Sequence, residues 1–236
     1  MMQNLSKTQE NLTRAAKLAV VGEFAAAMSH EIRTPLGILR SSADLLLREP
    51  RLTCEGKEVL GFVISETQRL NKLVSTLIDA SHPRAPVFAT ADMTKVINNA
   101  LALLRVQAES KGIVISSALP DSLFIQIDTD QITQILLNIL LNAIQILPAG
   151  GNVNLRLTKA DDAAKIEIAD DGPGILEENQ AQIFEPFFTQ RAGGVGLGLA
   201  IVRQIVLAHL GEIDCSNSQY SGAQFTISLP LNRKIH

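Results

Sequence analysis

The chain has 236 residues, 46% of them hydrophobic, so it is long enough for one large or two modest domains with buried cores and is not a disordered protein. A net charge of −3 and an aromatic content of 4% argue against a nucleic-acid-binding protein, which would present a basic face and stacking rings. No apolar run approaches the roughly 18 residues of a membrane-spanning helix, so we expect a cytoplasmic chain with no membrane segment.

The first part of the chain is predicted to form two helices. Apolar residues spaced seven apart over residues 5–19 indicate a short coiled-coil lead-in. The first helix runs on to about Arg48, where Pro50 follows, and a second helix starts near Thr53. Its apolar spacing alternates between three and four residues, which is typical of a packing seam: Leu60, Val63, Thr67, Leu70, Val74 and Leu77. A hairpin of two helices covers only part of each seam, so we expect a homodimer that forms a four-helix bundle.

The segment His82-Pro83-Arg84-Ala85-Pro86 interrupts any helix and is predicted to be a hinge between two domains. Beyond it, the order of helices and strands predicts a two-layer α/β sandwich. The predicted strands are residues 87–91, 113–118, 123–127, 152–158, 164–168, 212–216 and 224–229. The predicted helices are residues 93–110, a helix that Asp128 or Asp130 caps and that ends at Leu147, and residues 196–210. A polar loop is predicted from Asp170 to Val195.

The stretch Met28-Ser29-His30-Glu31-Ile32-Arg33-Thr34-Pro35-Leu36 sets an imidazole beside a carboxylate on the first helix. The apolar stripe of that helix is expected to be Ile32, Leu36, Leu39, Ala43 and Leu46. His30 lies roughly 160° from this stripe, with Thr34 one turn further along the same face. Pro35 removes the backbone hydrogen bond to the carbonyl of Glu31 and should bend the helix. A lone exposed histidine is usually an ordinary surface residue, but a helix defect beside a titratable pair favours a functional one.

Asn138 and Asn142 lie one turn apart on an otherwise apolar predicted helix. Burying either amide without a partner would cost about 1–3 kcal/mol, so a ligand or a neighbouring loop should bond them. An amide oxygen is a ligand that suits Mg²⁺, which takes few protein groups when phosphates share it.

Three further segments carry residues that packing alone does not require. In Asp170-Asp171-Gly172-Pro173-Gly174, a carboxylate at a strand end could accept a hydrogen bond from an exocyclic amine beside glycines that admit a flat base, although such sequences also form ordinary turns. Ile183-Phe184-Glu185-Pro186-Phe187-Phe188-Thr189 is either a hydrophobic latch or a loop anchored to the core. Gly194-Val195-Gly196-Leu197-Gly198-Leu199 opens a helix whose amides could bind phosphate.

The stretch around His30 resembles the H-box of sensor histidine kinases of two-component systems. The four downstream segments resemble, in the expected order, the N, G1, F and G2 boxes of their GHKL-type ATPase domain. The resemblance covers the chain from about Leu18 to Pro230. It implies a multidomain α and α+β fold, in which an antiparallel helical hairpin forming a dimeric four-helix bundle precedes a two-layer α/β sandwich. The implied parts are a coiled-coil lead-in (1–17), a dimerisation and histidine phosphotransfer domain (18–82), a hinge linker (83–90) and an ATP-binding domain (91–232).

This resemblance implies an ATP-dependent protein-histidine kinase that autophosphorylates His30 from Mg-ATP and passes the phosphoryl group to an aspartate of a response-regulator receiver domain. Glu31 would be the neighbouring acid/base, and Thr34 implies phosphatase activity toward the phosphorylated regulator. In the ATP site, Asn142 would hold Mg²⁺ and Asp170 would bond the adenine amine, with glycines shaping the base pocket and bordering the phosphates. The residues implied in this site are Asn138, Asn142, Asp170, Gly172, Gly174, Arg191, Gly194, Gly196, Leu197 and Gly198.

Relatives carry sensing modules before such a lead-in, so we expect the chain to be the catalytic fragment of a longer, membrane-tethered receptor. Two other classes of function are compatible with parts of the pattern. An ATP-driven dimer clamp would hydrolyse ATP without forming phosphohistidine, and a degenerate kinase acting as a scaffold would dock partners without binding nucleotide.

Overall fold

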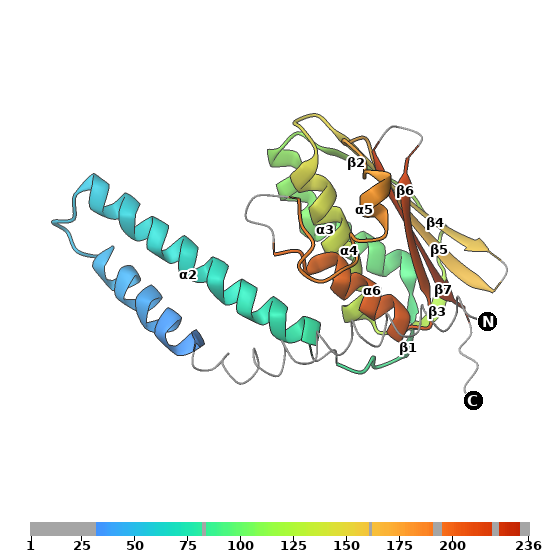
Figure 1. Ribbon diagram of the computed structural model, residues 1–236, viewed down its shortest axis with the longest axis horizontal. Coiled ribbons are helices and arrows are strands. Elements are labelled where there is room, and N and C mark those ends of the chain that lie inside the picture. The colour runs from blue at the N-terminus through green and yellow to red at the C-terminus, as the bar shows by residue number, and fades with distance from the viewer. Residues whose placement is uncertain (1–31, 82–83, 161, 191–194, 219–221, 232–236) are drawn as a thin grey trace. The chain divides into compact units, whose positions relative to one another are not determined.

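The structure, a computed structural model, describes residues 32–81, 84–160, 162–190, 195–218 and 222–231 (Figure 1). The chain forms two compact units, Met1–Pro83 and Arg84–His236. Their boundary falls within the proline-containing segment in which the sequence predicts a hinge, while the limits predicted for the individual domains remain predictions. Within the described residues, no helix is long and apolar enough to cross a membrane.

The first unit is a helical hairpin. Residues 32–46 are helical, and after a short turn α2 (Cys54–Ser81) runs back alongside them (Figure 1). The second helix begins after Thr53 because the Thr53 hydroxyl oxygen accepts the N–H of Gly56 at 3.1 Å, which caps the first turn. Both helix limits agree with the sequence prediction to within about two residues.

Only part of the predicted apolar stripe is covered in this hairpin. Leu36 and Ala43 are buried, whereas Leu39 and Leu46 are each 52% exposed. The reason is that each helix has one neighbour, which covers one side of a stripe more than one residue wide. Thr34 is exposed, as the helical periodicity predicts. His30 and Glu31 lie outside the described residues.

The second unit contains two sheets. In the larger sheet the strand order is β2-β4-β5-β7-β6, with β2 and β4 parallel and the other neighbours antiparallel. Its strands are β2 (Val114–Ala118), β4 (Asn152–Ala160), β5 (Ala163–Asp170), β7 (Ala223–Pro230) and β6 (Glu212–Asn217). The smaller sheet pairs β1 (Ala89–Asp92) with β3 (Phe124–Ile127) antiparallel. Burial alternates along β4, β5 and β7, so one face of the larger sheet is buried.

Three helices cover that buried face and complete a two-layer α/β sandwich (Figure 1). They are α3 (Met93–Ser110), α4 (Thr129–Ile146) and α6 (Gly198–Ala208). Asp92 and Asp128 begin α3 and α4 by accepting backbone N–H groups of the first turn. The predicted fold class, a helical hairpin followed by an α/β sandwich, is confirmed.

Several details differ from the sequence prediction. The helix predicted over residues 196–210 is the shorter α6. A four-residue helix, α5 (Glu177–Gln180), lies within the segment predicted as an uninterrupted loop. The strand predicted from Val87 to Ala91 begins at Ala89 instead. The physical reason is that the N–H of Val87 donates to the carboxylate of Asp128 at 2.9 Å, so this residue is bonded to a helix cap rather than to a neighbouring strand.

Candidate active site

Asp170 lies at the end of β5 and is only 6% exposed. Its Oδ1 accepts the N–H of Gly172 at 2.9 Å and the N–H of Ala223 at 3.0 Å. The hydroxyl of Ser218 donates to the Asp170 carbonyl oxygen at 3.0 Å. Burial raises the pKa of the Asp170 carboxyl, the two backbone hydrogen bonds oppose that shift, and the neighbouring Asp171 charge adds to it. The backbone therefore fixes the orientation of a carboxylate that burial makes costly to ionise.

Two glycines make room for this carboxylate. A Cβ at Gly222 would collide with the carbonyl oxygen and Oδ1 of Asp170. At Gly172 a Cβ would lie 3.0 Å from the same Oδ1, which is tighter than most contacts of this kind. Gly172 is predicted from the sequence, whereas Gly222 and Ser218 are not. The available signal was a glycine two residues before the last predicted strand, and a glycine near a strand end often marks a close approach of another group.

Asp171, the next residue, has a different environment. Asn152 donates to its carboxylate from the backbone N–H at 2.7 Å and from Nδ2 at 2.8 Å. These hydrogen bonds lower the pKa of the exposed Asp171 carboxyl. The structure thus separates two adjacent carboxylates: Asp171 caps the start of β4, while Asp170 lies in the buried site.

Asn138 and Asn142 are both half-buried on α4. The Asn138 Nδ2 donates to the carbonyl oxygen of Gly198 at 3.3 Å, which joins α4 to the first residue of α6. The Asn138 amide nitrogen therefore has a hydrogen-bond partner within the protein. Of the two partners that the sequence left open, a ligand or a neighbouring segment, the structure shows the second for this nitrogen. Asn142 also interacts with its surroundings.

The glycine-rich segment is shaped by the neighbouring phenylalanine loop. Gly196 has φ +71°, and a Cβ there would lie 2.5 Å from the backbone of both Phe187 and Phe188. The N–H of Phe187 donates to the Gly196 carbonyl oxygen at 2.9 Å. Gly196 is thus required by the close approach of two backbones, whatever its role toward a ligand. Leu197 is 1% exposed, so its side chain packs in the core.

The phenylalanine loop is anchored to the core, which is one of the two roles that the sequence left open. Phe184 is buried and packs edge-on against Phe225, with ring centroids 6.4 Å apart. Phe187 is 49% exposed and has φ +67°, an uncommon value for a residue with a side chain. One ring anchors the loop to the core and another is presented to solvent.

The remaining predicted residues are placed as follows. Gly174 has φ +73°, a conformation that favours glycine in the turn after β5. Arg191 and Gly194 lie outside the described residues, as do His30 and Glu31 of the first unit. Among the described residues, no group of three or more His, Cys, Asp or Glu side chains could hold a metal ion.

Two parts of the chain match known protein families. Residues 20–86 match the His Kinase A (phospho-acceptor) domain, and residues 127–233 match the histidine kinase-, DNA gyrase B- and HSP90-like ATPase. The sensor histidine kinase ZraS of Escherichia coli (strain K12) is 35% identical over 225 residues, which covers 95% of this chain and 48% of ZraS. The signal transduction histidine-protein kinase AtoS of the same strain is 34% identical over 228 residues, which covers 96% of this chain and 37% of AtoS. The chain thus spans half the length of these relatives or less.

Solved structures resemble both units. Full-length ShkA in complex with AMPPNP has a TM-score of 0.80 and 29% identity, covering 92% of this chain and 47% of ShkA. Histidine kinase ThkA in complex with the response regulator protein TrrA has a TM-score of 0.68 and 26% identity, covering 97% of this chain and 67% of that one. With a helical hairpin matching the phospho-acceptor domain and a sandwich matching the ATPase domain, the chain belongs to the sensor histidine kinases and comprises their catalytic core.

Proposed function

We propose that this chain transfers the γ-phosphoryl group of ATP to its own His30 and then to an aspartate on a response-regulator receiver domain. The observation that carries the proposal is the buried Asp170 carboxylate, which two backbone amides hold at the end of β5. ShkA binds AMPPNP and ThkA binds a response regulator in their crystals, which supports ATP and a receiver domain as the substrates here.

In this proposal, Asp170 recognises the adenine amine. Both of its described side-chain hydrogen bonds end on Oδ1, so among the described residues Oδ2 retains its capacity to accept a hydrogen bond from a ligand. Gly172 and Gly174 let the backbone lie close to the base. The phosphates would lie near the start of α6, and the residues assigned to that end are Asn138, Asn142, Arg191, Gly194, Gly196, Leu197 and Gly198.

The donor set on α4 fits a magnesium ion that is shared with phosphates. Asn142 can offer a neutral amide oxygen, and the described residues hold no carboxylate cluster that would bind a metal without phosphate. When bound, Mg²⁺ would neutralise phosphate charge during transfer. The role of the chain's own residues is to hold the nucleotide in a fixed orientation and to supply the nucleophile.

The transfer step proposed at His30 is a displacement at phosphorus. An imidazole nitrogen forms the N–P bond while the bond from the γ-phosphorus to the oxygen bridging it to the β-phosphate breaks, and ADP leaves with that oxygen. An unperturbed imidazole is mostly neutral near pH 7 and so carries a lone pair for this attack. Glu31 accepts the proton that the other ring nitrogen loses.

The direct test is incubation of the chain with γ-labelled ATP and magnesium. We expect label that is stable in base and lost in acid, as a phosphorus–nitrogen bond should be. His30→Gln should remove it, and the matched control His82→Gln should keep it. Labelling that survives His30→Gln would reject the assignment. ATP hydrolysis without labelled protein would favour a clamp, and absence of nucleotide binding would favour a scaffold.

The second activity that we propose is removal of the phosphoryl group from the regulator. Thr34 is exposed on the helix of residues 32–46, where its hydroxyl could position a water molecule. Thr34→Ala should slow dephosphorylation of a cognate regulator while leaving labelling of His30 intact, and Thr34→Ser should restore it. Equal dephosphorylation by Thr34→Ala and the unaltered chain would remove this proposal.

The homodimer, the cytoplasmic location and the upstream sensing module belong to the same proposal. The phospho-acceptor family match and the uncovered apolar stripe of the hairpin support a dimer. The need for ATP and a receiver domain supports a cytoplasmic location, and the greater length of the relatives supports further domains.

A further inference from the structure

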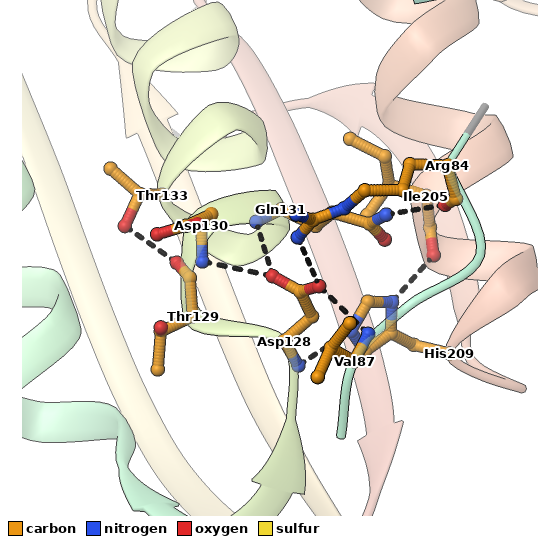
Figure 2. Close-up of polar contacts among 9 residues, drawn as sticks. All are labelled: Arg84, Val87, Asp128, Thr129, Asp130, Gln131, Thr133, Ile205 and His209. Carbon is orange, nitrogen blue, oxygen red and sulfur yellow. Dashed lines mark hydrogen bonds and ion pairs between the residues drawn. The ribbon is translucent and has the colours of Figure 1, made fainter. Parts of the chain in front are cut away.

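The first residues of the ATPase unit are held by a polar cluster that is centred on the buried Asp128 side chain (Figure 2). We call it the linker clasp, and it consists of Arg84, Val87, Asp128, Gln131 and His209. The Asp128 side chain is only 4% exposed, and its Oδ2 accepts hydrogen bonds from Arg84 Nη2 at 2.8 Å and from the Val87 N–H at 2.9 Å. The Gln131 Nε2 donates to the Arg84 carbonyl oxygen at 2.7 Å. Arg84 is therefore held through both its side chain and its backbone.

His209 supports the clasp from the end of α6. Its Nε2 accepts the N–H of Asp128 at 3.1 Å, and its Nδ1 lies 2.9 Å from the Ile205 carbonyl oxygen. Accepting at one nitrogen and donating at the other requires the neutral ring with its proton on Nδ1. The Phe88 ring packs edge-on against this imidazole, with centroids 5.0 Å apart. The segment that enters β1 is thus attached to the start of α4 and to the end of α6.

The clasp contains more than helix capping requires. Capping of α4 uses only Oδ1 of Asp128, which accepts the N–H groups of Asp130 and Gln131 at 3.1 Å each (Figure 2). The other oxygen and the Gln131 amide are committed to the linker. Within the described residues, the buried Oε1 of Gln131 has no hydrogen-bond partner. The amide therefore donates to the Arg84 carbonyl oxygen although this orientation leaves a buried acceptor unpaired, which is unfavourable.

The linker clasp determines how many residues separate the end of α2 from the first residue that is held by the ATPase unit; we call these residues the tether. Helix α2 ends at Ser81 and the clasp begins at Arg84, so two residues separate them. Three residue steps span at most roughly 10 Å. If the clasp opened as far as the start of β1 at Ala89, the eight steps from Ser81 would span up to roughly 28 Å. Closing the clasp shortens the attainable separation by more than half.

We propose that the linker clasp keeps the tether short and thereby raises the effective concentration at which ATP held by the second unit meets His30. Arg84 and Asp128 are positioning residues in this scheme, which rests on the proposed autophosphorylation. Effective concentration falls roughly as the −3/2 power of tether length, so opening from three steps to eight lowers it about fourfold.

The test compares Arg84→Ala and Asp128→Asn with the unaltered full chain. Asparagine caps a helix as well as aspartate does, so Asp128→Asn removes the charge and keeps the start of α4. We expect the rate constant for labelling at saturating ATP to fall about fourfold in both variants, with the KM for ATP unchanged. Arg105→Ala is the matched control, because Arg105 forms an exposed ion pair with Glu109 on α3 and should leave both parameters unchanged. Hydrogen exchange at the Val87 amide should be faster in the two clasp variants only.

Several outcomes would overturn the inference. Normal labelling rates in variants whose Val87 amide exchanges faster would show that tether length does not limit transfer. A raised KM would show that the cluster supports the nucleotide site instead, and unchanged exchange would show that the ion pair does not hold the segment. Absence of phosphohistidine in the unaltered chain would reject the proposed function, and the inference with it, even where the exchange data confirm a closed clasp.

Discussion

At the scale of single residues, two features of Asp170 bear on its role. It is buried, which raises its pKa, and its orientation is fixed by the backbone N–H groups of Gly172, just after β5, and of Ala223, at the start of the neighbouring strand β7. A structural role alone would be served as well by a neutral side chain that accepts the same two bonds. This difference allows the ligand-binding and the structural roles to be separated by one substitution.

Asp170→Asn should weaken nucleotide binding without weakening the fold. The amide oxygen can keep the two backbone hydrogen bonds, whereas the amide nitrogen would oppose the adenine amine with a donor. A hydrogen bond to a charged group contributes about 1.5–3 kcal/mol, which corresponds to about a 10- to 100-fold loss of affinity. Calorimetry with a non-hydrolysable ATP analogue measures the affinity, and urea unfolding measures the stability. Loss of stability with unchanged affinity would contradict the assignment.

Gly222→Ala should damage the same site through packing. The added methyl group would collide with the backbone and carboxylate of Asp170, and forcing an extra carbon into a packed site costs about 1–3 kcal/mol. We expect lower stability to urea together with weaker binding of the ATP analogue. Gly61→Ala is the control, because a Cβ at this helical position meets nothing within 4 Å and should be neutral or stabilising. Equal behaviour of the two variants would show that the site can relax around the methyl group.

At the scale of elements, α4 connects the parts of the ATPase unit. Its N-terminal cap belongs to the linker clasp, and Asn138 further along donates to the first residue of α6. The last turn of α6 supplies Ile205 and the following His209 to the same clasp. Two helices that carry candidate nucleotide residues are therefore joined to each other and to the linker.

The Asp128 carboxylate gives this arrangement a defined pH dependence. Burial alone would raise its pKa, but hydrogen bonds from Val87, Gln131 and Arg84 outweigh burial, and the pKa lies below its ordinary value. A pKa that is lower in the folded than in the unfolded state means stabilisation that is complete above about pH 3.9 and is lost as the pH falls through the folded-state value.

Urea unfolding of the unaltered chain and of Asp128→Asn should therefore differ by a pH-independent amount between about pH 5 and 8. We expect a difference of about 1 kcal/mol, since the Arg84 side of the ion pair is exposed and screened. The difference should shrink as the pH falls below about 4, where the carboxylate is protonated first in the unfolded chain and then, at lower pH, in the folded one. A difference that already disappeared at pH 6 would show that another group carries the effect.

At the scale of the whole molecule, the packing of the two helices within the hairpin leaves several large apolar side chains exposed. Its large exposed side chains are Ile38, Leu39, Leu45, Leu46, Val59, Phe62 and Leu70. Isolated exposed apolar residues are common in soluble proteins, but seven of them on one hairpin favour association. A second copy of the hairpin, packed as a four-helix bundle, would bury them.

Phe62→Glu should therefore weaken self-association. Phe62 is 73% exposed in the single chain, and leaving such a ring in water costs about 1.5–3 kcal/mol relative to burying it. We expect at least about a tenfold increase in the dimer dissociation constant, measured by sedimentation equilibrium. Val106→Glu on α3, at a position 77% exposed, is the control and should leave the dimer intact. Equal dissociation constants would place the association surface elsewhere.

The sequence by itself determined the order and type of the elements and the positions of most motif residues. The limits of α3 were predicted to the residue, and the Asp128 cap was one of two residues proposed for α4. These features depend on local hydrogen bonds and on apolar periodicity, which a sequence displays directly. Gly172 and Asp170 were found for the same reason, since they lie in one short motif.

Only the tertiary structure decided which distant residues complete the sites. Ala223 donates to Asp170 across 53 positions, and Asp128 donates to His209 across 81. Gly196 is required by the backbone of Phe187 and Phe188, and Gly222 by Asp170. Such contacts follow from how strands pair and how helices pack on the sheet, and they leave no periodic signal because each involves a single residue from each segment. Long-range packing therefore decided how the nucleotide residues are held and how the linker is attached.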